Sequence, residues 1–213
     1  MQEVLQAAHL RFEKNTTYPD PSSEDFLVRL AYGNDGIKMW AKEVKEGVLW
    51  KPLKKDASFV ASGNGTDSLT TNVPDFYTFL RAEEQPAIII SGKTEWQEVT
   101  PQDGSKAIQD GVTNGYVFWV EAGNLRTLPS IAGTVQFPYI KKPIKYVTGL
   151  ESTPIEIEDE EFLIEYILGM LYLDDNNMSQ YQAHMENAKD YLFSMKISTI
   201  NEIPSDNGFG MGM

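Results

Sequence analysis

The chain has 213 residues, and 18 lysines and arginines against 31 aspartates and glutamates give it a formal net charge of −13. It has no cysteine, which excludes disulfide bonds, thiolate zinc sites and cysteine nucleophiles. The acidic balance opposes tight binding to nucleic-acid phosphates, because such binding depends on lysine and arginine. No segment resembles a signal peptide, and the most apolar run, residues 162–173, is too short to span a bilayer. We therefore expect a soluble protein that is made in a cytoplasm.

The first part of the chain, residues 1–46, has the periodicity of helices. Val4, Ala8 and Phe12 recur at helical spacing, which predicts an amphipathic helix over residues 2–14. A second apolar stripe begins at residue 26, after a break that contains two prolines. Gly33-Asn34-Asp35-Gly36 interrupts this stripe, so we expect either a kink or two short helices.

The middle of the chain, residues 47–150, changes to a β-type pattern. Turn-forming sequences, among them Asp103-Gly104, Asn114-Gly115 and Ala122-Gly123-Asn124, separate short runs of β-branched and aromatic residues. Short strands at this spacing predict a small sandwich or barrel. The expected strands are residues 48–50, 58–60, 87–90, 95–99, 116–120, 125–128 and 134–137.

The last part predicts a helical hairpin over residues 151–197, followed by a tail over residues 198–213. The hairpin has a dense apolar face from residue 162 to 171, and Tyr181, Ala188 and Met195 mark an apolar stripe on its second helix. Asn177 or Ser179 can cap that second helix. The glycine-rich tail should stay flexible until a partner orders it. The predicted fold class is α+β, with terminal helices that form a bundle around a β-rich insertion.

Residues with catalytic potential are few. The two histidines, His9 and His184, lie on expected helices, and neither a Gly-x-Ser-x-Gly elbow nor a His-Glu-x-x-His motif is present. Acidic runs at residues 158–161 and 174–177 are typical of helix caps and loops. We therefore expect no enzymatic activity, no cofactor and no metal.

A carbohydrate-binding or hydrolytic β domain is the one alternative that carries chemistry. Trp96 and Trp119 would then stack on a sugar, and Glu95 or Glu98 would serve as acid and base.

A basic and aromatic patch is expected where the β-rich part ends. Lys141, Lys142 and Lys145 lie near Tyr139 and Tyr146 in the sequence. The patch could contact DNA or an acidic partner, but lysines that protect a solvated strand edge explain it as well.

Several short motifs follow one another along nearly the whole chain. They are Asn72-Val73-Pro74-Asp75-Phe76, Tyr116-Val117-Phe118-Trp119 with Gly123-Asn124-Leu125, Leu128-Pro129 with Gly133-Thr134-Val135, Phe137-Pro138-Tyr139-Ile140-Lys141-Lys142-Pro143, Ile155-Glu156-Ile157, and Leu171-Tyr172-Leu173 before an acidic loop. In this order, between N-terminal helices and a helical hairpin, they resemble the head-to-tail adaptor (connector) proteins of short-tailed bacteriophages. The chain departs from a minimal adaptor in its long β-rich insertion.

The resemblance implies a structural protein of the virion, at the head–tail junction. Such adaptors form a ring, usually twelvefold, below the portal protein and extend the DNA channel towards the tail or nozzle proteins. DNA passes through without specific binding, and no membrane is involved. The C-terminal helix and tail of such proteins dock on the portal, which assigns portal contact here to Tyr191, Phe193, Phe209, Met211 and Met213. A stopper, tail-completion or minor head protein is the alternative within the virion.

Overall fold

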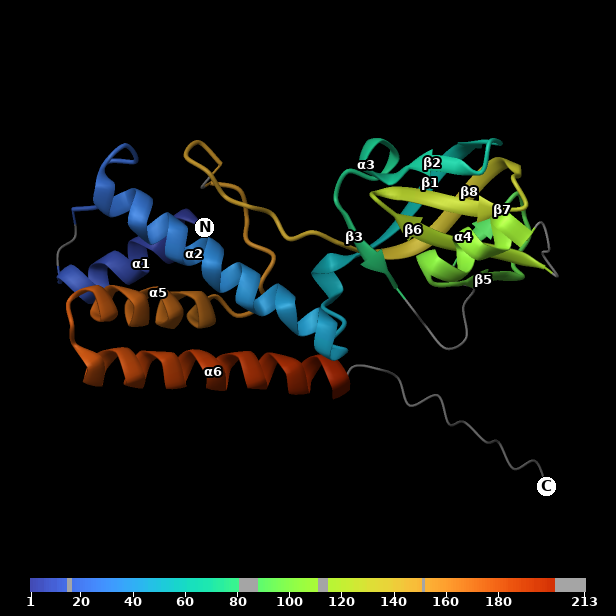
Figure 1. Cartoon of the computed structure of the whole chain (residues 1–213). Helices are drawn as coiled ribbons and strands as arrows, with labels where there is room; N and C mark the ends of the chain where they lie inside the picture. The colour runs from blue at the N-terminus through green and yellow to red at the C-terminus, as the bar shows by residue number, and fades with distance from the viewer. Residues whose placement is uncertain (15–16, 81–87, 111–114, 151, 202–213) are drawn as a thin grey trace, which may run out of the picture. The chain divides into compact units, whose positions relative to one another are not determined.

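Along the sequence, helices precede and follow a β-rich middle in the computed structural model, which describes residues 1–14, 17–80, 88–110, 115–150 and 152–201 (Figure 1). The α+β prediction is confirmed. The chain divides into two compact units, one made of Met1–Pro52 with Pro143–Met213 and the other of Leu53–Lys142. We call them the helical unit and the β unit. Their boundaries lie inside the expected limits of 47 and 150, because residues 47–52 and 143–150 belong to the helical unit.

The helical unit is built around helix α5. Its helices are α1 (Gln2–Glu13), α2 (Glu24–Lys42), the 3-10 turn η1 (Glu43–Glu46), α5 (Glu160–Asp174) and α6 (Met178–Asn201). Helix α5 contacts α1, α2 and α6, and lies between α6 and the N-terminal helices in Figure 1. The sequence predicts one apolar face on α5, yet Ile164 and Leu168 on other sides are buried as well. A helix with neighbours on several sides needs apolar residues on each of them.

Helix α2 is continuous, so the division into two short helices, one of the two outcomes expected at Gly33–Gly36, is wrong. A Cβ on Gly33 would lie 3.2 Å from the Met1 sulfur, and one on Gly36 would lie 2.8 Å from Leu163 Cδ2. The two glycines therefore let α2 approach its neighbours closely. The buried Asn34 side chain donates to the carbonyl oxygens of Leu30 (3.0 Å) and Tyr146 (2.8 Å) and accepts from the Tyr146 amide (2.8 Å). What resembles a turn in the sequence is a packing surface and an anchor for residue 146.

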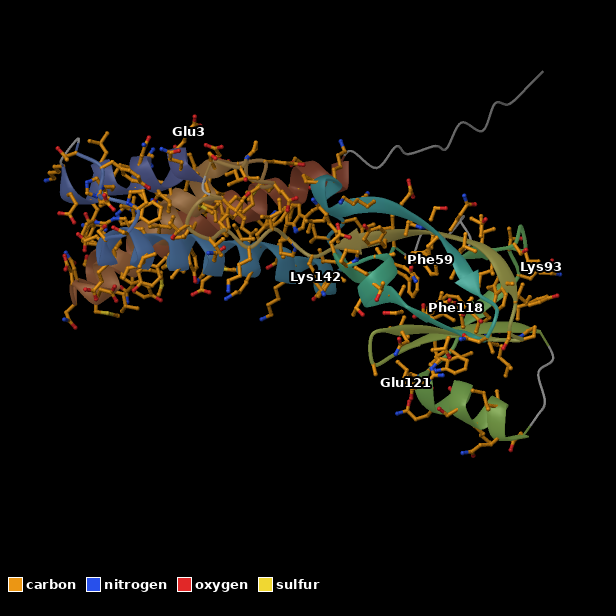
Figure 2. The ribbon with its side chains drawn as sticks, turned by 90° about the horizontal axis from the view of Figure 1, so that it is seen from above. Glu3, Phe59, Lys93, Phe118, Glu121 and Lys142 are labelled. Carbon is orange, nitrogen blue, oxygen red and sulfur yellow. The ribbon has the colours of Figure 1, made fainter. Side chains whose placement is uncertain are left out.

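The β unit consists of two sheets with a shared apolar core. One sheet has the order β1-β8-β3, with β4 also paired to β8, and the other has the order β2-β7-β6-β5. The strands are β1 (Lys54–Ser62), β2 (Thr66–Ser68), β3 (Phe76–Phe79), β4 (Ile89–Ile90), β5 (Trp96–Glu98), β6 (Tyr116–Glu121), β7 (Asn124–Leu128) and β8 (Ala132–Lys141). Figure 2 shows Phe118 between the two sheets, where its ring packs on Phe79, and Phe79 in turn packs on Phe137 in the same core. The arrangement is a small sandwich.

The strands differ from the prediction in two ways. Residues 48–50 form no strand, and Trp50 instead packs inside the helical unit, where its ring stacks on Trp40 and its Nε1–H donates to the Trp40 carbonyl at 3.0 Å. Strands β2 and β3, and the short helix α3 (Leu69–Asn72) between them, were not predicted. These segments have only three or four residues each, which is too few for a clear period-2 signal. Of the expected strand 87–90, residue 87 lies outside the described residues.

A helix replaces the turn predicted at Asp103-Gly104. Helix α4 (Pro101–Asp110) connects β5 to β6, which are parallel, and a parallel pair needs a crossover connection rather than a tight turn. Thr100 caps the helix, because its Oγ1 accepts from the Asp103 amide at 3.2 Å. A Cβ on Gly104 would lie 2.5 Å from Trp119 Cδ2, so the helix backbone rests directly on the indole. Asn114 of the other expected turn lies outside the described residues.

Substituting Gly104 tests this close contact. Alanine usually stabilises a helix by about 1 kcal/mol relative to glycine. We expect the opposite for Gly104→Ala, a loss of about 1–3 kcal/mol, because the methyl group overpacks the Trp119 ring. Chemical denaturation followed by tryptophan fluorescence measures the change. Lys106→Ala, at an exposed position of the same helix, is the matched control, and a Gly104→Ala variant as stable as this control would contradict the contact.

Candidate functional site

Helix α6 carries the surface that the sequence assigns to partner binding. Asn177 caps its start, since its Oδ1 accepts from the Gln180 amide at 3.3 Å, as predicted. Ala188, Leu192 and Met195 are buried along one side of the helix, which contacts α5. The helix continues to Asn201, so the tail predicted to begin at 198 is wrong for residues 198–201. The described part of the chain therefore ends with a helix of 24 residues.

A buried carboxylate fixes α6 to α5. Glu165 of α5 is 8% exposed, and its Oε2 lies 2.8 Å from His184 Nδ1 and accepts from Asn187 Nδ2 at 2.9 Å. The His184 ring also stacks on Tyr172 with a centroid distance of 5.2 Å. Burial of a carboxylate is favourable only when hydrogen bonds replace its water. Both partners on α6 are therefore needed to offset the cost of burying Glu165.

The first helix of the chain joins the same network. Arg11 of α1 pairs with both oxygens of Glu161 at 2.7 and 2.8 Å and approaches Glu165 at 3.5 Å. The hydrogen bond from Arg11 lowers the pKa of the Glu161 carboxyl below its usual value. The pair therefore keeps its charge into mildly acidic solution. Sequence reasoning missed this network, although a glutamate inside the apolar run of α5 and a histidine beside the apolar stripe of α6 were its signals.

The outer face of α6 combines polar and apolar residues. Phe193 is 61% exposed and Ile197, one turn further on, is 43% exposed. Tyr191 is half-buried on another side of the helix, so the two described members of the expected portal-contact set do not share one surface. Lys196 pairs with Glu43 of η1, which fixes the last turns of α6 next to the end of α2. Phe209, Met211 and Met213 lie outside the described residues.

A second surface of the helical unit is a groove along α2. It has a volume of about 360 Å³ and lies between α2 and the segment of residues 145–148. Leu27, Ala31 and Lys38 line it from α2, and Lys145 and Val147 line it from the other side. Leu27 and Val147 are each 47% exposed. None of the residues that line the groove comes from α6.

The structure contradicts the sugar-stacking role expected for Trp96 and Trp119. Trp96 is 5% exposed and Trp119 is 1% exposed, so neither indole offers a face to a sugar. Trp96 belongs to the sandwich core, and Trp119 lies on the opposite side of its sheet under α4. Adjacent residues of a strand point to opposite faces of the sheet. Phe118 and Trp119 are both buried, because the sandwich core covers one face and α4 covers the other.

The basic and aromatic patch also differs from the expectation. The tyrosines expected in it are buried: Tyr139 donates its hydroxyl hydrogen to Asp75 Oδ1 at 2.7 Å, and Tyr146 donates to the Pro154 carbonyl at 2.6 Å. Lys141 and Lys142 belong to the β unit and Lys145 to the helical unit. Tyr139 and Tyr146 therefore offer no exposed ring face to the lysines.

The part of the chain that the structure describes contains no group of three His, Asp or Glu side chains placed to hold a metal ion. A hollow of about 370 Å³ lies against β1, β4 and β8 of the β unit, lined by Asp56, Ser58 and Gln136 among others. Among the described helices, none is long and apolar enough to cross a membrane.

No family model and no curated protein sequence matches the chain. Its function is therefore argued from the order of its parts and from the surfaces of its helical unit.

Removing the Glu165 carboxylate should loosen α6. In Glu165→Ala, His184 and Asn187 lose their acceptor and a small cavity remains, so we expect a loss of about 2–4 kcal/mol in the free energy of unfolding. Hydrogen exchange of the α6 amides should accelerate. Glu186→Ala, at an exposed position of the same helix, should change stability by less than about 0.5 kcal/mol. Equal protection of α6 in both variants would show that the network does not hold the helix.

Proposed function

We propose that the protein is a structural component of a bacteriophage particle, a head-to-tail adaptor that forms a ring below the portal and extends the DNA channel towards the tail. One observation supports this most directly. Helix α6 is held on α5 by one side and leaves Phe193 and Ile197 exposed, next to the point where residues 202–213 continue the chain. Exposed apolar residues that are close together on a protein of net charge −13 favour a protein partner.

The division into two units agrees with this role. The helical unit combines both ends of the chain, as the motif order of short-tailed phage adaptors implies, and the β unit is an insertion between them. A strongly acidic protein suits a channel through which DNA must slide, because its lysines and arginines, which could bind the DNA phosphates, are outnumbered by aspartates and glutamates.

Portal contact falls to the segment after α6 in this proposal. Phe209, Met211 and Met213 alternate with glycines in the sequence. Methionine and phenylalanine are apolar and, with glycine between them, can adapt to an irregular partner surface. Tyr191 is half-buried and contributes to the stability of α6 more than to direct contact.

Native mass spectrometry of the chain, alone and mixed with the portal protein encoded beside it, tests this function. We expect a ring on the portal, usually of twelve copies. A variant without residues 201–213 should stay folded but no longer bind the portal protein, because it lacks the apolar residues that we propose to contact the portal. The full-length triple variant Phe209→Ala, Met211→Ala and Met213→Ala is the control for chain length and should also fail to bind.

Two results would contradict the proposal. Portal binding by the variant without residues 201–213 would remove the docking role of that segment. A folded protein that never associates with the portal would favour a stopper, tail-completion or minor head protein, and the copy number in the particle would then identify its place.

A further inference from the structure

The exposed stripe of α6 has two chemically different halves. Glu186, Asp190, Phe193 and Ile197 are exposed and follow one another at intervals of four, three and four residues, so they share one face of the helix. The half nearer the start of α6 is acidic, and the half nearer its end is apolar.

The groove along α2 has the complementary halves. The Asn34 side chain holds residue 146 beside the middle of α2 through both of its polar atoms. The segment after β8 runs antiparallel to α2 in Figure 1. From the order of the chain on either side of Tyr146, we infer that Lys145 lies toward Lys38 and Val147 toward Leu27, all four of which line the groove. The half of the groove nearer the start of α2 is therefore apolar, and the other half is basic.

The two surfaces also match in length. Leu27 and Lys38 are eleven positions apart on α2, and Glu186 and Ile197 are eleven positions apart on α6. At 1.5 Å per residue each stripe is about 16 Å long. Ala31 offers a small side chain one turn after Leu27, where the large Phe193 ring needs room.

We propose that the outer face of α6 of one copy lies antiparallel in the α2 groove of a second copy. Phe193 and Ile197 then pack against Leu27, Ala31 and Val147, while Glu186 and Asp190 face Lys38 and Lys145. This inference rests on the proposed function, because the second copy is the neighbour in the adaptor ring. It assigns Phe193 to contact between subunits, in place of the portal contact expected from the sequence.

Charge determines the orientation. In the antiparallel arrangement the acidic half of α6 meets the two lysines, although Asp35 also lines the groove and pairs with Lys38 at 2.7 Å. Lys189 is exposed beside Asp190 on α6 and can face Asp35. The parallel arrangement would bury Lys38 and Lys145 under Phe193 and Ile197 without a new partner, which is costly.

The interface joins two different surfaces of the same chain. In Figure 1, α6 and the segment of residues 143–150 lie on opposite sides of α2. A contact between different surfaces is heterologous, and it repeats from copy to copy until it closes into a ring or extends as a filament.

Cysteine cross-linking tests the interface directly, because the native chain has no cysteine that would react. Ala31→Cys places a small thiol in the proposed contact and Ser194→Cys places one at its edge. Neither change removes the large apolar side chains of the contact, and a short bismaleimide links the two thiols. A mixture of the two variants should give a cross-linked dimer, whereas each variant alone should not. The double variant should give a ladder of multimers. Ile108→Cys, exposed on α4 of the β unit, mixed with Ser194→Cys, is the matched control.

A charge exchange tests the orientation. Lys145→Glu and Glu186→Lys should each lower the yield of the cross-link roughly two- to fivefold at low salt, since each puts like charges together. The two changes combined should restore the yield. A combination no better than the single changes would overturn the antiparallel register.

The experiment separates this inference from the proposed function. It is run on the concentrated protein alone and again with the portal protein. Cross-linking in solution without portal binding would keep the interface and reject the adaptor role. Portal binding with cross-linking no greater than in the control mixture, in both samples, would keep the adaptor role and overturn the interface.

Discussion

The buried carboxylate of Glu165 is the interaction on which the helical unit depends. It lies in the most apolar helix of the protein, and His184, Asn187 and Arg11 reach it from two other helices. The Glu165 carboxylate disfavours other registers of α6 along α5, because a shift of α6 would leave this buried group without its hydrogen bonds. Apolar packing holds α5 and α6 together, and Glu165 defines their register. The outer stripe of α6 therefore has a defined direction.

The close backbone contacts have a similar effect in both units. Gly36 brings α2 against Leu163, Gly169 lets the Met185 side chain reach α5, and Gly104 seats α4 on Trp119. In each place a methyl group would meet heavy atoms within 3 Å. Glycine is costly inside a helix, and here the cost is offset by closer packing. The close approach of α6 to α5 depends on the Gly169 contact, and that of α2 to α5 on the Gly36 contact.

Periodicity predicts the terminal helices, most of the longer strands and the fold class, because each of these depends on a repeating apolar pattern. It fails where a residue has two uses. Gly33, Gly36 and Gly104 resemble turn residues, and only the neighbouring helix or indole shows why glycine is needed. Trp50 resembles a strand residue but packs on Trp40. The Glu165 network and the α2 groove join segments more than 15 residues apart along the chain, so a local pattern can mark a single unusual residue such as Glu165 but not the residues with which it pairs.

The helical unit contains both the first and the last parts of the chain, and this has a consequence for synthesis on the ribosome. Helices α1 and α2 emerge early, but their main neighbour α5 begins only at Glu160. The β unit is continuous in sequence, and its strands can pair as soon as they have emerged. We expect the insertion to fold first, and its folding shortens the distance between Pro52 and Pro143 that the helical unit must close. The segment that looks like an addition to the bundle would then assist its assembly.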